Sequence, residues 1–329
     1  MLSFYVHIPY CIKRCGYCDF NTYTPSELQD GATLEIVSND YIDAVLRELE
    51  SSPTDPVPTI FFGGGTPSIL QMADLKFLIE TVYDNYSIIE NPEITLEANP
   101  DDLTEDRIIE LLNTKINRLS IGIQSFFEDD LKLMNRAHNA EEAKKCLEIA
   151  TQYFGNISLD LIYGIPGMTN EIWKKNIEIA LSFGINHISS YALTVEPKTV
   201  FGVQKKKGSF VEIPDSAMAN AFMQVRNYLE SKGYEGYETS NFAKEGHYSV
   251  HNTSYWQQEP YLGIGPSAHS FNGHSRQWNV ANNAKYLVSG LELAEKEELS
   301  LADQYNEYLM VRLRTKWGIN LVYVQKTLT

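Results

Sequence analysis

The chain has 329 residues, of which 43% are hydrophobic and 21% charged, so it can bury a large core without structural metals or disulfides. Its formal net charge of −16 repels phosphate backbones and argues against nucleic acid as a partner. No apolar stretch reaches the roughly 18 residues of a membrane span and no signal-peptide pattern opens the chain, so we expect a cytoplasmic protein. The four cysteines then indicate metal ligands rather than disulfides.

Short β-rich runs alternate with amphipathic helical segments from residue 3 to about residue 240. The predicted strands are 3–9, 59–64, 93–100, 118–125, 156–164 and 187–194. Such a repeat predicts parallel strands joined by right-handed crossovers. Six units are fewer than the eight of a closed barrel, so we expect an open, partial (β/α)6 barrel, with a doubly wound sheet as the alternative.

Unusual residues follow every one of these strands at its carboxyl end. The stretches are Cys11 to Cys18, Gly63 to Pro67, Glu97 to Pro100, Gln124 to Ser125, Asp160 to Pro166 and Tyr191 to Leu193. Each of these stretches by itself could simply form a turn. Because both candidate architectures bring these ends to one edge of the sheet, we expect one shared site.

The pattern changes after about residue 240, where a loop-rich stretch dense in His, Tyr, Trp, Gly and Pro begins. We therefore expect two domains: 1–238, the barrel, and 239–329, a smaller α+β module. The last residues, 321–329, end without a helix-terminating signal, which raises the possibility of a truncated C-terminus.

Three cysteines, Cys11, Cys15 and Cys18, form a C-x3-C-x2-C loop after the first strand. A structural zinc site usually pairs two C-x2-C knuckles to reach four ligands, and the sequence has no second knuckle. The fourth cysteine, Cys146, lies in a helical pattern and is interpreted as an ordinary semi-buried residue. A [4Fe–4S] cluster normally takes four cysteines, so three leave one iron open to a ligand such as S-adenosylmethionine.

This loop, placed after the first strand of a partial barrel, resembles the radical S-adenosylmethionine superfamily. The resemblance implies that Tyr17 lies against the adenine and that the glycine-rich stretch Gly63 to Pro67 meets the amino group of the methionine. Consecutive glycines also leave the backbone uncovered. A tight turn without a ligand is the alternative for that stretch.

Further phrases resemble the oxygen-independent coproporphyrinogen III oxidase family and, within it, the heme chaperone branch called HemW. They are YVHIPYC, FFGGGTPS, LEANP, SIGIQSF, LMNRAH, DLIYGIPG, YETSNFAKEGHYSVHNTSYW and YLGIGPSAHS, and they span Tyr5 to about Gly318. By this resemblance the S-adenosylmethionine site is lined by Tyr5, Gly64, Gly65, Thr66, Glu97, Gln124, Arg136, Asp160 and Ala192. Glu97, Gln124 and Asp160 would bond the ribose hydroxyls, and Arg136 would hold the ligand's carboxylate in a fork. For Glu97 or Asp160 alone, a surface carboxylate or helix cap is the alternative.

Two departures favour the chaperone branch over the oxidases. Phe20 stands where the oxidases carry one more cysteine, and only ten residues precede Cys11, so their N-terminal arm is missing. The stretch His251 to Trp256, HNTSYW, matches the HNxxYW pattern associated with heme in the chaperone branch.

His251 is therefore the first candidate for the axial ligand of heme iron, with Tyr255 and Trp256 packed on the macrocycle. His247 and His269 compete with it, and a purely structural, hydrogen-bonded role for His251 remains open. Arg276 or the lysines at 205–207 would receive the heme propionates.

The resemblance implies a heme chaperone that carries a [4Fe–4S] cluster, S-adenosylmethionine and heme, receives electrons from a donor and hands heme to an unidentified acceptor protein. A homodimer is a further possibility. The alternative is a radical oxidase that decarboxylates coproporphyrinogen III to protoporphyrinogen IX, and a zinc-stabilised α/β protein is the third reading. Whether the chain works as an enzyme is left open.

Overall fold

The computed structural model describes residues 1–27, 34–50 and 56–327. Its centre is a run of six parallel strands that pair in chain order. They are β1 (Ser3–Ile8), β2 (Val57–Gly64), β3 (Ile88–Ala98), β4 (Arg118–Gln124), β5 (Ile157–Tyr163) and β6 (His187–Ala192). All six predicted strands are present, and the sheet stays open, so the predicted partial barrel is confirmed.

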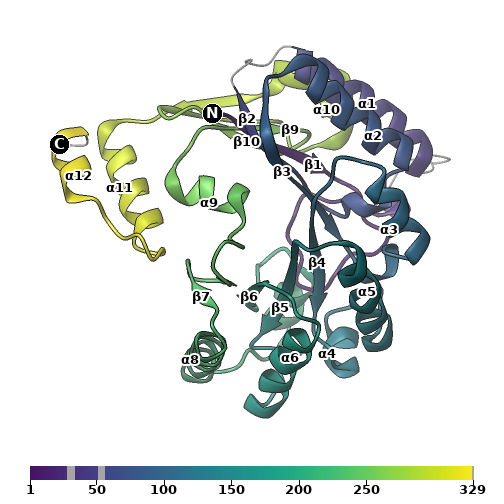
Figure 1. The fold of residues 1–329 in the computed structure, drawn as a ribbon, viewed down its shortest axis with the longest axis vertical. Helices are drawn as coiled ribbons and strands as arrows, with labels where there is room; N and C mark the ends of the chain where they lie inside the picture. The colour runs from purple at the N-terminus through teal and green to yellow at the C-terminus, as the bar shows by residue number, and fades with distance from the viewer. Residues whose placement is uncertain (28–33, 51–55, 328–329) are drawn as a thin grey trace.

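Helices connect these strands and cover the outer face of the sheet, where Figure 1 shows α1 to α6. They are α1 (Leu34–Glu50), α2 (Met72–Asn85), α3 (Glu105–Leu112), α4 (Glu128–Leu133), α5 (Ala140–Tyr153) and α6 (Asn170–Ser182). Two more helices, α7 (Val200–Lys206) and α8 (Asp215–Ser231), follow β6. Short 3-10 helices lie at Pro25–Glu27, Pro67–Ile69, Pro100–Asp102 and Gly290–Leu293. In α2 the buried residues Leu75, Leu78, Ile79 and Val82 recur every three or four positions, so one face of the helix packs on the core.

The remaining strands extend this sheet at both edges. β7 (Glu235–Gly236) and β8 (Asn241–Ala243) form a hairpin beside β6, whereas β9 (Tyr261–Ile264) pairs in parallel with β1. β10 (His269–Phe271), β11 (Ser275–Trp278) and β12 (Glu295–Glu298) continue from β9 as antiparallel neighbours. Strands from both predicted domains thus form one sheet, and the expected boundary at residue 238 falls in the turn of the β7–β8 hairpin. The division into two domains stays a prediction.

Within the described residues, the α-helices that follow the hairpin are α9 (Val250–Gln257), α10 (Asn283–Ser289), α11 (Leu301–Arg312) and α12 (Leu321–Thr327). Figure 1 shows α9, α11 and α12 on the side of the sheet away from α1 and α2, with α9 closest to the central strands. α10 lies on the opposite side of the sheet, beside α1. None of the helices in the described ranges is long and apolar enough to cross a membrane.

Candidate functional site

The cysteine loop wraps a cavity of about 440 Å³ that all three of its cysteines line. Backbone hydrogen bonds hold the loop, from Cys11 N to Tyr23 O at 3.0 Å and from Gly16 N to Met134 O at 2.9 Å. Among the described residues no three His, Cys, Asp or Glu side chains converge as ligands of a single metal ion. Three thiols that line one cavity could each bind a different iron of a cluster.

Two polar side chains bond the sulfur atoms. Thr66 Oγ1 donates to Cys11 Sγ at 3.3 Å, and Arg136 Nη1 donates to Cys15 Sγ at 3.2 Å. Burial raises the pKa of Cys18 to about 11. The free thiol is thus biased toward its protonated form, and binding to a metal would release this proton.

Most of the predicted S-adenosylmethionine residues meet at this cavity. Its lining includes Tyr17, Gly64, Gly65, Thr66, Glu97, Gln124, Arg136, Asp160 and Ala192. Tyr5 is the exception, because it lines a second, larger chamber. The shared edge of parallel strands explains why residues up to 175 positions apart along the chain, from Tyr17 to Ala192, lie together. Their roles in binding the ligand stay predictions.

The glycine-rich stretch packs tightly on the cysteine loop. Gly64 has a φ of +108°, in the region that favours glycine, and a Cβ on Gly65 would lie 2.5 Å from the carbonyl oxygen of Tyr10. Gly65 N donates to Ile8 O at 2.7 Å and Thr66 N to Tyr10 O at 2.8 Å. The glycines therefore allow a close backbone approach, and their occupied N–H groups leave carbonyl oxygens as the backbone groups suited to a ligand's ammonium.

Two carboxyls at this cavity have unusual acidities. Burial, followed by the charge of Asp160, raises the pKa of Glu97 to about 8. Burial also raises the pKa of Asp160 to about 6. Glu97 Oε2 accepts a hydrogen bond from Gly64 N at 3.0 Å. Perturbed carboxyls that line a cavity are typical of functional sites.

The guanidinium of Arg136 is tied to the protein. Besides Cys15, it donates from Nη2 to Asn99 Oδ1 at 2.6 Å and to Gly122 O at 2.7 Å. Its Nε is buried without a hydrogen-bond partner among the described residues. Arg136 thus supports the cysteine loop directly, a role that its sequence position did not reveal. Nearby Gln124 has a φ of +67°, a strained conformation often found at functional sites.

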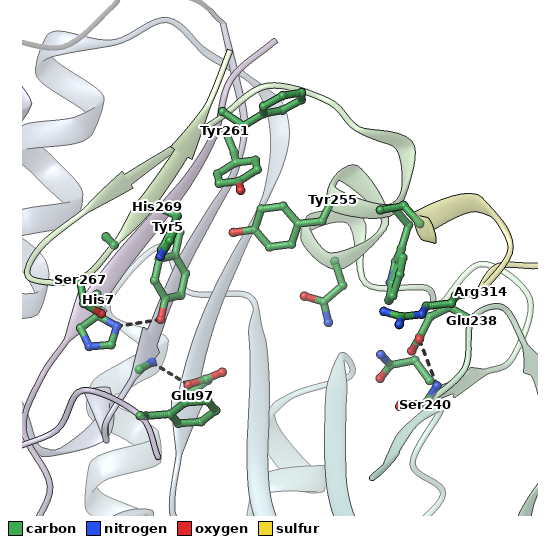
Figure 2. Close-up of a pocket in the computed structure, with 18 of the residues that line it drawn as sticks. Tyr5, His7, Glu97, Glu238, Ser240, Tyr255, Tyr261, Ser267, His269 and Arg314 are labelled. Atoms are coloured by element: carbon green, nitrogen blue, oxygen red, sulfur yellow. Dashed lines mark hydrogen bonds between the residues drawn. The ribbon is translucent and has the colours of Figure 1, made fainter. Parts of the chain in front are cut away.

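The second cavity is a chamber of about 1060 Å³, hereafter the large chamber. Five residues line both cavities, so the two adjoin: Asp19, Phe20, Gly64, Glu97 and Tyr191. Aromatic side chains supply much of its wall: Tyr5, Tyr255, Trp256, Tyr261 and Phe271. Figure 2 shows Tyr255 between two groups, with Tyr5, His7 and His269 on one side and Glu238, Ser240 and Arg314 on the other.

His251 lies outside both cavities and is 1% exposed. Its Nδ1 lies 2.7 Å from Thr59 Oγ1 and its Nε2 lies 2.8 Å from the hydroxyl of Tyr255, while the ring stacks on Phe61 with centroids 4.8 Å apart. Burial lowers its pKa to about 3. Both ring nitrogens are engaged and the ring is enclosed, which favours the structural, hydrogen-bonded alternative, while the axial-ligand role of His251 stays a prediction. His251 therefore does not face the large chamber, whereas Tyr255 and Trp256 from the same motif line it.

Of the competing histidines, His269 lines the large chamber and His247 does not. The His269 ring stacks with Trp278 at a centroid distance of 5.9 Å and is exposed. Burial and the positive charge of Arg276 lower its pKa. A neutral imidazole facing a chamber is the form that binds metals.

The cations predicted to receive the heme propionates are either paired with a carboxylate or lie outside the large chamber. Arg276 lines the large chamber, but its guanidinium forms a two-pronged ion pair with Glu307 at 2.9 and 2.7 Å. Lys205 pairs with Glu212, and the lysines at 205–207 line neither cavity. Tyr261, Phe271 and Arg314 also line the large chamber but were not among the predicted site residues. Tyr261 opens the phrase YLGIGPSAHS, whereas no quoted motif contains Phe271 or Arg314, which reach the chamber through the fold of the C-terminal segment.

Cys146 lies on the buried face of α5, 3% exposed and away from the cysteine loop's cavity. Burial raises the pKa of its thiol to about 12. This placement agrees with its interpretation as a buried structural residue.

Known proteins are similar to this chain in both sequence and fold. Residues 5–180 match the Radical SAM superfamily. Two chains described as heme chaperone HemW are each 35% identical: that of Buchnera aphidicola over 318 residues, 94% of this chain and 81% of the relative, and that of Bacillus subtilis over 326 residues, 97% and 85%.

The structure of coproporphyrinogen III oxidase (HemN) from Escherichia coli superposes with a TM-score of 0.83 at 22% identity, covering 99% of this chain and 78% of that one. At this identity the likeness concerns the fold alone, and it supports the open barrel. The superfamily match covers the cysteine loop and the ends of β1 to β5, and the two HemW matches cover 94% and 97% of the chain. The chain therefore belongs to the radical SAM superfamily and, within it, to the HemW family.

Proposed function

We propose that this chain is a heme chaperone, which binds a [4Fe–4S] cluster, S-adenosylmethionine and heme and delivers heme to an acceptor protein. The names of its relatives support this role. The observation that carries it is the pair of adjoining cavities, one lined by three cysteines and the other large and aromatic. One protein could thus hold both groups side by side.

Cys11, Cys15 and Cys18 would hold the cluster, and the rest of their cavity would hold S-adenosylmethionine. When bound, a cluster with one open iron supplies the electron for reductive cleavage of the sulfonium. The chain's own groups prepare this site, since Thr66 and Arg136 donate hydrogen bonds to the sulfurs of Cys11 and Cys15 and so stabilise negative charge there. Glu97 and Asp160 remain candidates for the ribose hydroxyls.

The large chamber would hold heme. Its volume of about 1060 Å³ is at the upper end of ligand pockets, which span about 300 to 1,000 Å³. Tyr5, Tyr255 and Phe271 offer ring faces and edges on which a macrocycle can pack. We assign His269 as candidate axial ligand in place of His251, because it lines the chamber and its lowered pKa favours the neutral ring.

Delivery implies an acceptor protein for the heme, and the cluster implies an electron donor. A cytoplasmic location and a homodimer are further parts of the proposal. Cell fractionation and measurement of the molecular mass in solution would test the last two.

The deciding experiment reconstitutes the cluster anaerobically and then makes two measurements on the same sample. Hemin titration should produce a saturable Soret band. Incubation with coproporphyrinogen III, S-adenosylmethionine and a reductant should give no decarboxylated product. Turnover to protoporphyrinogen IX would overturn the chaperone proposal in favour of the oxidase. The Cys146→Ala variant, altered away from both cavities, should behave like the wild type in both measurements.

A further inference from the structure

The two arginines that line the large chamber differ in whether a carboxylate pairs with them. Its described lining contains three carboxyls, Asp19, Glu97 and Glu238, and two arginines, Arg276 and Arg314. Arg276 is neutralised by Glu307, at 2.7 Å. The guanidinium of Arg314, in contrast, makes no hydrogen bond or ion pair within the described part of the chain. Arg314 is therefore the uncompensated cation of this described lining.

The backbone of Arg314 is fixed although its side chain is free. It follows α11, in a turn that bonds to the β7–β8 hairpin: Thr239 Oγ1 donates to Arg314 O at 3.3 Å, and Lys316 N donates to Tyr237 O at 3.0 Å. A β-bridge also joins Thr315 to Glu238. These contacts hold the turn against the edge of the chamber, so the arginine is presented to the chamber by a fixed backbone.

The groups beside Arg314 make this end of the chamber polar. Glu238 Oε2 accepts a hydrogen bond from Ser240 N at 3.0 Å, while its Oε1 and Asn241 Oδ1 are buried without a partner among the described residues. Tyr5 and His269 lie across the chamber (Figure 2). A ligand whose apolar ring packs beside Tyr5 and His269 while a carboxylate at its edge reaches Arg314 matches this arrangement.

Two of the three carboxyls of the chamber, Glu238 and Glu97, do not cancel this match. Burial raises the pKa of Glu238, and burial with the charge of Asp160 raises the pKa of Glu97 to about 8. Both groups are thus biased toward their neutral forms, which weakens their repulsion of an anionic ligand. Arginine presents a planar fork that matches a carboxylate in a bidentate pair.

We infer that Arg314 anchors a propionate of the porphyrin bound in the large chamber and thereby sets the orientation of the ring. The inference rests on the proposed heme-binding function. It assigns the propionate end of the ligand to the turn after α11, instead of to Arg276 or to the lysines at 205–207. Arg314 is a positioning residue in this assignment.

The test compares hemin with hemin dimethyl ester, which lacks both carboxylates, by titration of the Soret band. The wild type should bind the ester about tenfold more weakly than hemin, since a hydrogen bond between charged groups is lost. Arg314→Gln should weaken hemin binding by a similar factor and leave ester binding unchanged. Arg314→Lys, which keeps the charge but not the fork, should fall between the two.

Arg226→Gln is the matched control. Arg226 is an exposed arginine on α8 that pairs with Glu230 and does not line the chamber, so its variant should bind both ligands like the wild type. Equal wild-type affinity for hemin and its ester, or equal weakening of both by Arg314→Gln, would overturn the inference and leave the proposed function standing. A wild type that binds neither ligand would overturn both.

Discussion

The Nε2 atom of His251 lies 2.8 Å from the hydroxyl oxygen of Tyr255, one turn further along α9. On its other side, Nδ1 lies 2.7 Å from Thr59 Oγ1 on β2. The imidazole therefore links the central sheet to a tyrosine in the wall of the large chamber. Through Tyr255 and Trp256, the stretch His251 to Trp256 contributes to the wall of that chamber.

Replacing this histidine should affect the fold first. His251→Ala removes two hydrogen bonds and a stacked ring from a fully buried position, so we expect the free energy of unfolding to fall by about 3 kcal/mol. Urea denaturation measures this loss. The Soret maximum of bound heme should stay near that of the wild type, since no axial ligand is removed.

His269→Ala provides the contrast. This side chain is exposed, so stability should change by less than about 0.5 kcal/mol, while the Soret maximum should shift because the proposed axial ligand is lost. If His251→Ala shifted the maximum and His269→Ala did not, the assignment of the ligand would be reversed.

The cysteines should divide into two classes. Serine at position 11, 15 or 18 should abolish the charge-transfer absorbance of the reconstituted cluster, because in the proposed site each thiolate would bind its own iron. Cys146→Ala should keep that absorbance and cost about 1 kcal/mol of stability from a small cavity in α5. Iron and sulfide analysis measures the cluster content. Full cluster content in any of the three serine variants would remove that cysteine from the ligand set.

The acidity of Glu97 predicts a pH dependence of stability in the protein without its cofactors. Its pKa is about 8 when folded against an ordinary value of 4.5, so between these values the folded state holds a proton that the unfolded chain has released. The free energy of unfolding should therefore fall as pH rises from about 4.5 to about 8. Glu97→Gln cannot ionise and should show a flatter profile.

The comparison uses urea unfolding of both proteins at several pH values from 5 to 9. The difference in stability between the variant and the wild type isolates Glu97 from the other titrating groups, apart from its coupling to Asp160. It should grow with pH and level off above about pH 8. A difference that is constant with pH would contradict the raised pKa.

Glu48 predicts how firmly the C-terminal segment is attached. This carboxylate on α1 is 3% exposed and accepts hydrogen bonds from Gly265 N at 3.0 Å, Asn279 Nδ2 at 2.7 Å and the Tyr286 hydroxyl at 2.6 Å. Glu48→Ala leaves these buried donors without their acceptor, so stability should fall by about 3 to 5 kcal/mol.

Asp43→Ala, an exposed carboxylate on the same helix, should change stability by less than about 0.5 kcal/mol. Protease sensitivity of residues beyond Gly265 should rise in the Glu48 variant and not in the control. If both variants unfolded like the wild type, the attachment would have to lie elsewhere.

Local pattern was enough to predict the central strands. Hydrophobic periodicity marked 3–9 and 118–125 as strands because each is flanked by turn residues and buries side chains in a parallel sheet. The spacing of Cys11, Cys15 and Cys18 carried the cluster prediction for a similar reason, since one short loop supplies all three thiols.

The large chamber could not be predicted in this way. Tyr5, Tyr255 and Arg314 come from β1, α9 and the turn after α11, and nothing in their spacing indicates that they face one space. His251 shows the same limit: its place in a motif predicts a ligand role, but whether its nitrogens are free depends on Thr59, which is 192 positions away in the sequence.

The sequence by itself determined the open barrel, the cysteine loop and the edge of the sheet where the site lies, because these depend on periodicity and short-range spacing. Only the tertiary structure decided that His251 is enclosed, that Arg276 is neutralised by Glu307 and that Arg314 faces the chamber unpaired. The physical reason is that the availability of a side chain depends on partners brought to it by long-range packing, which local sequence does not encode.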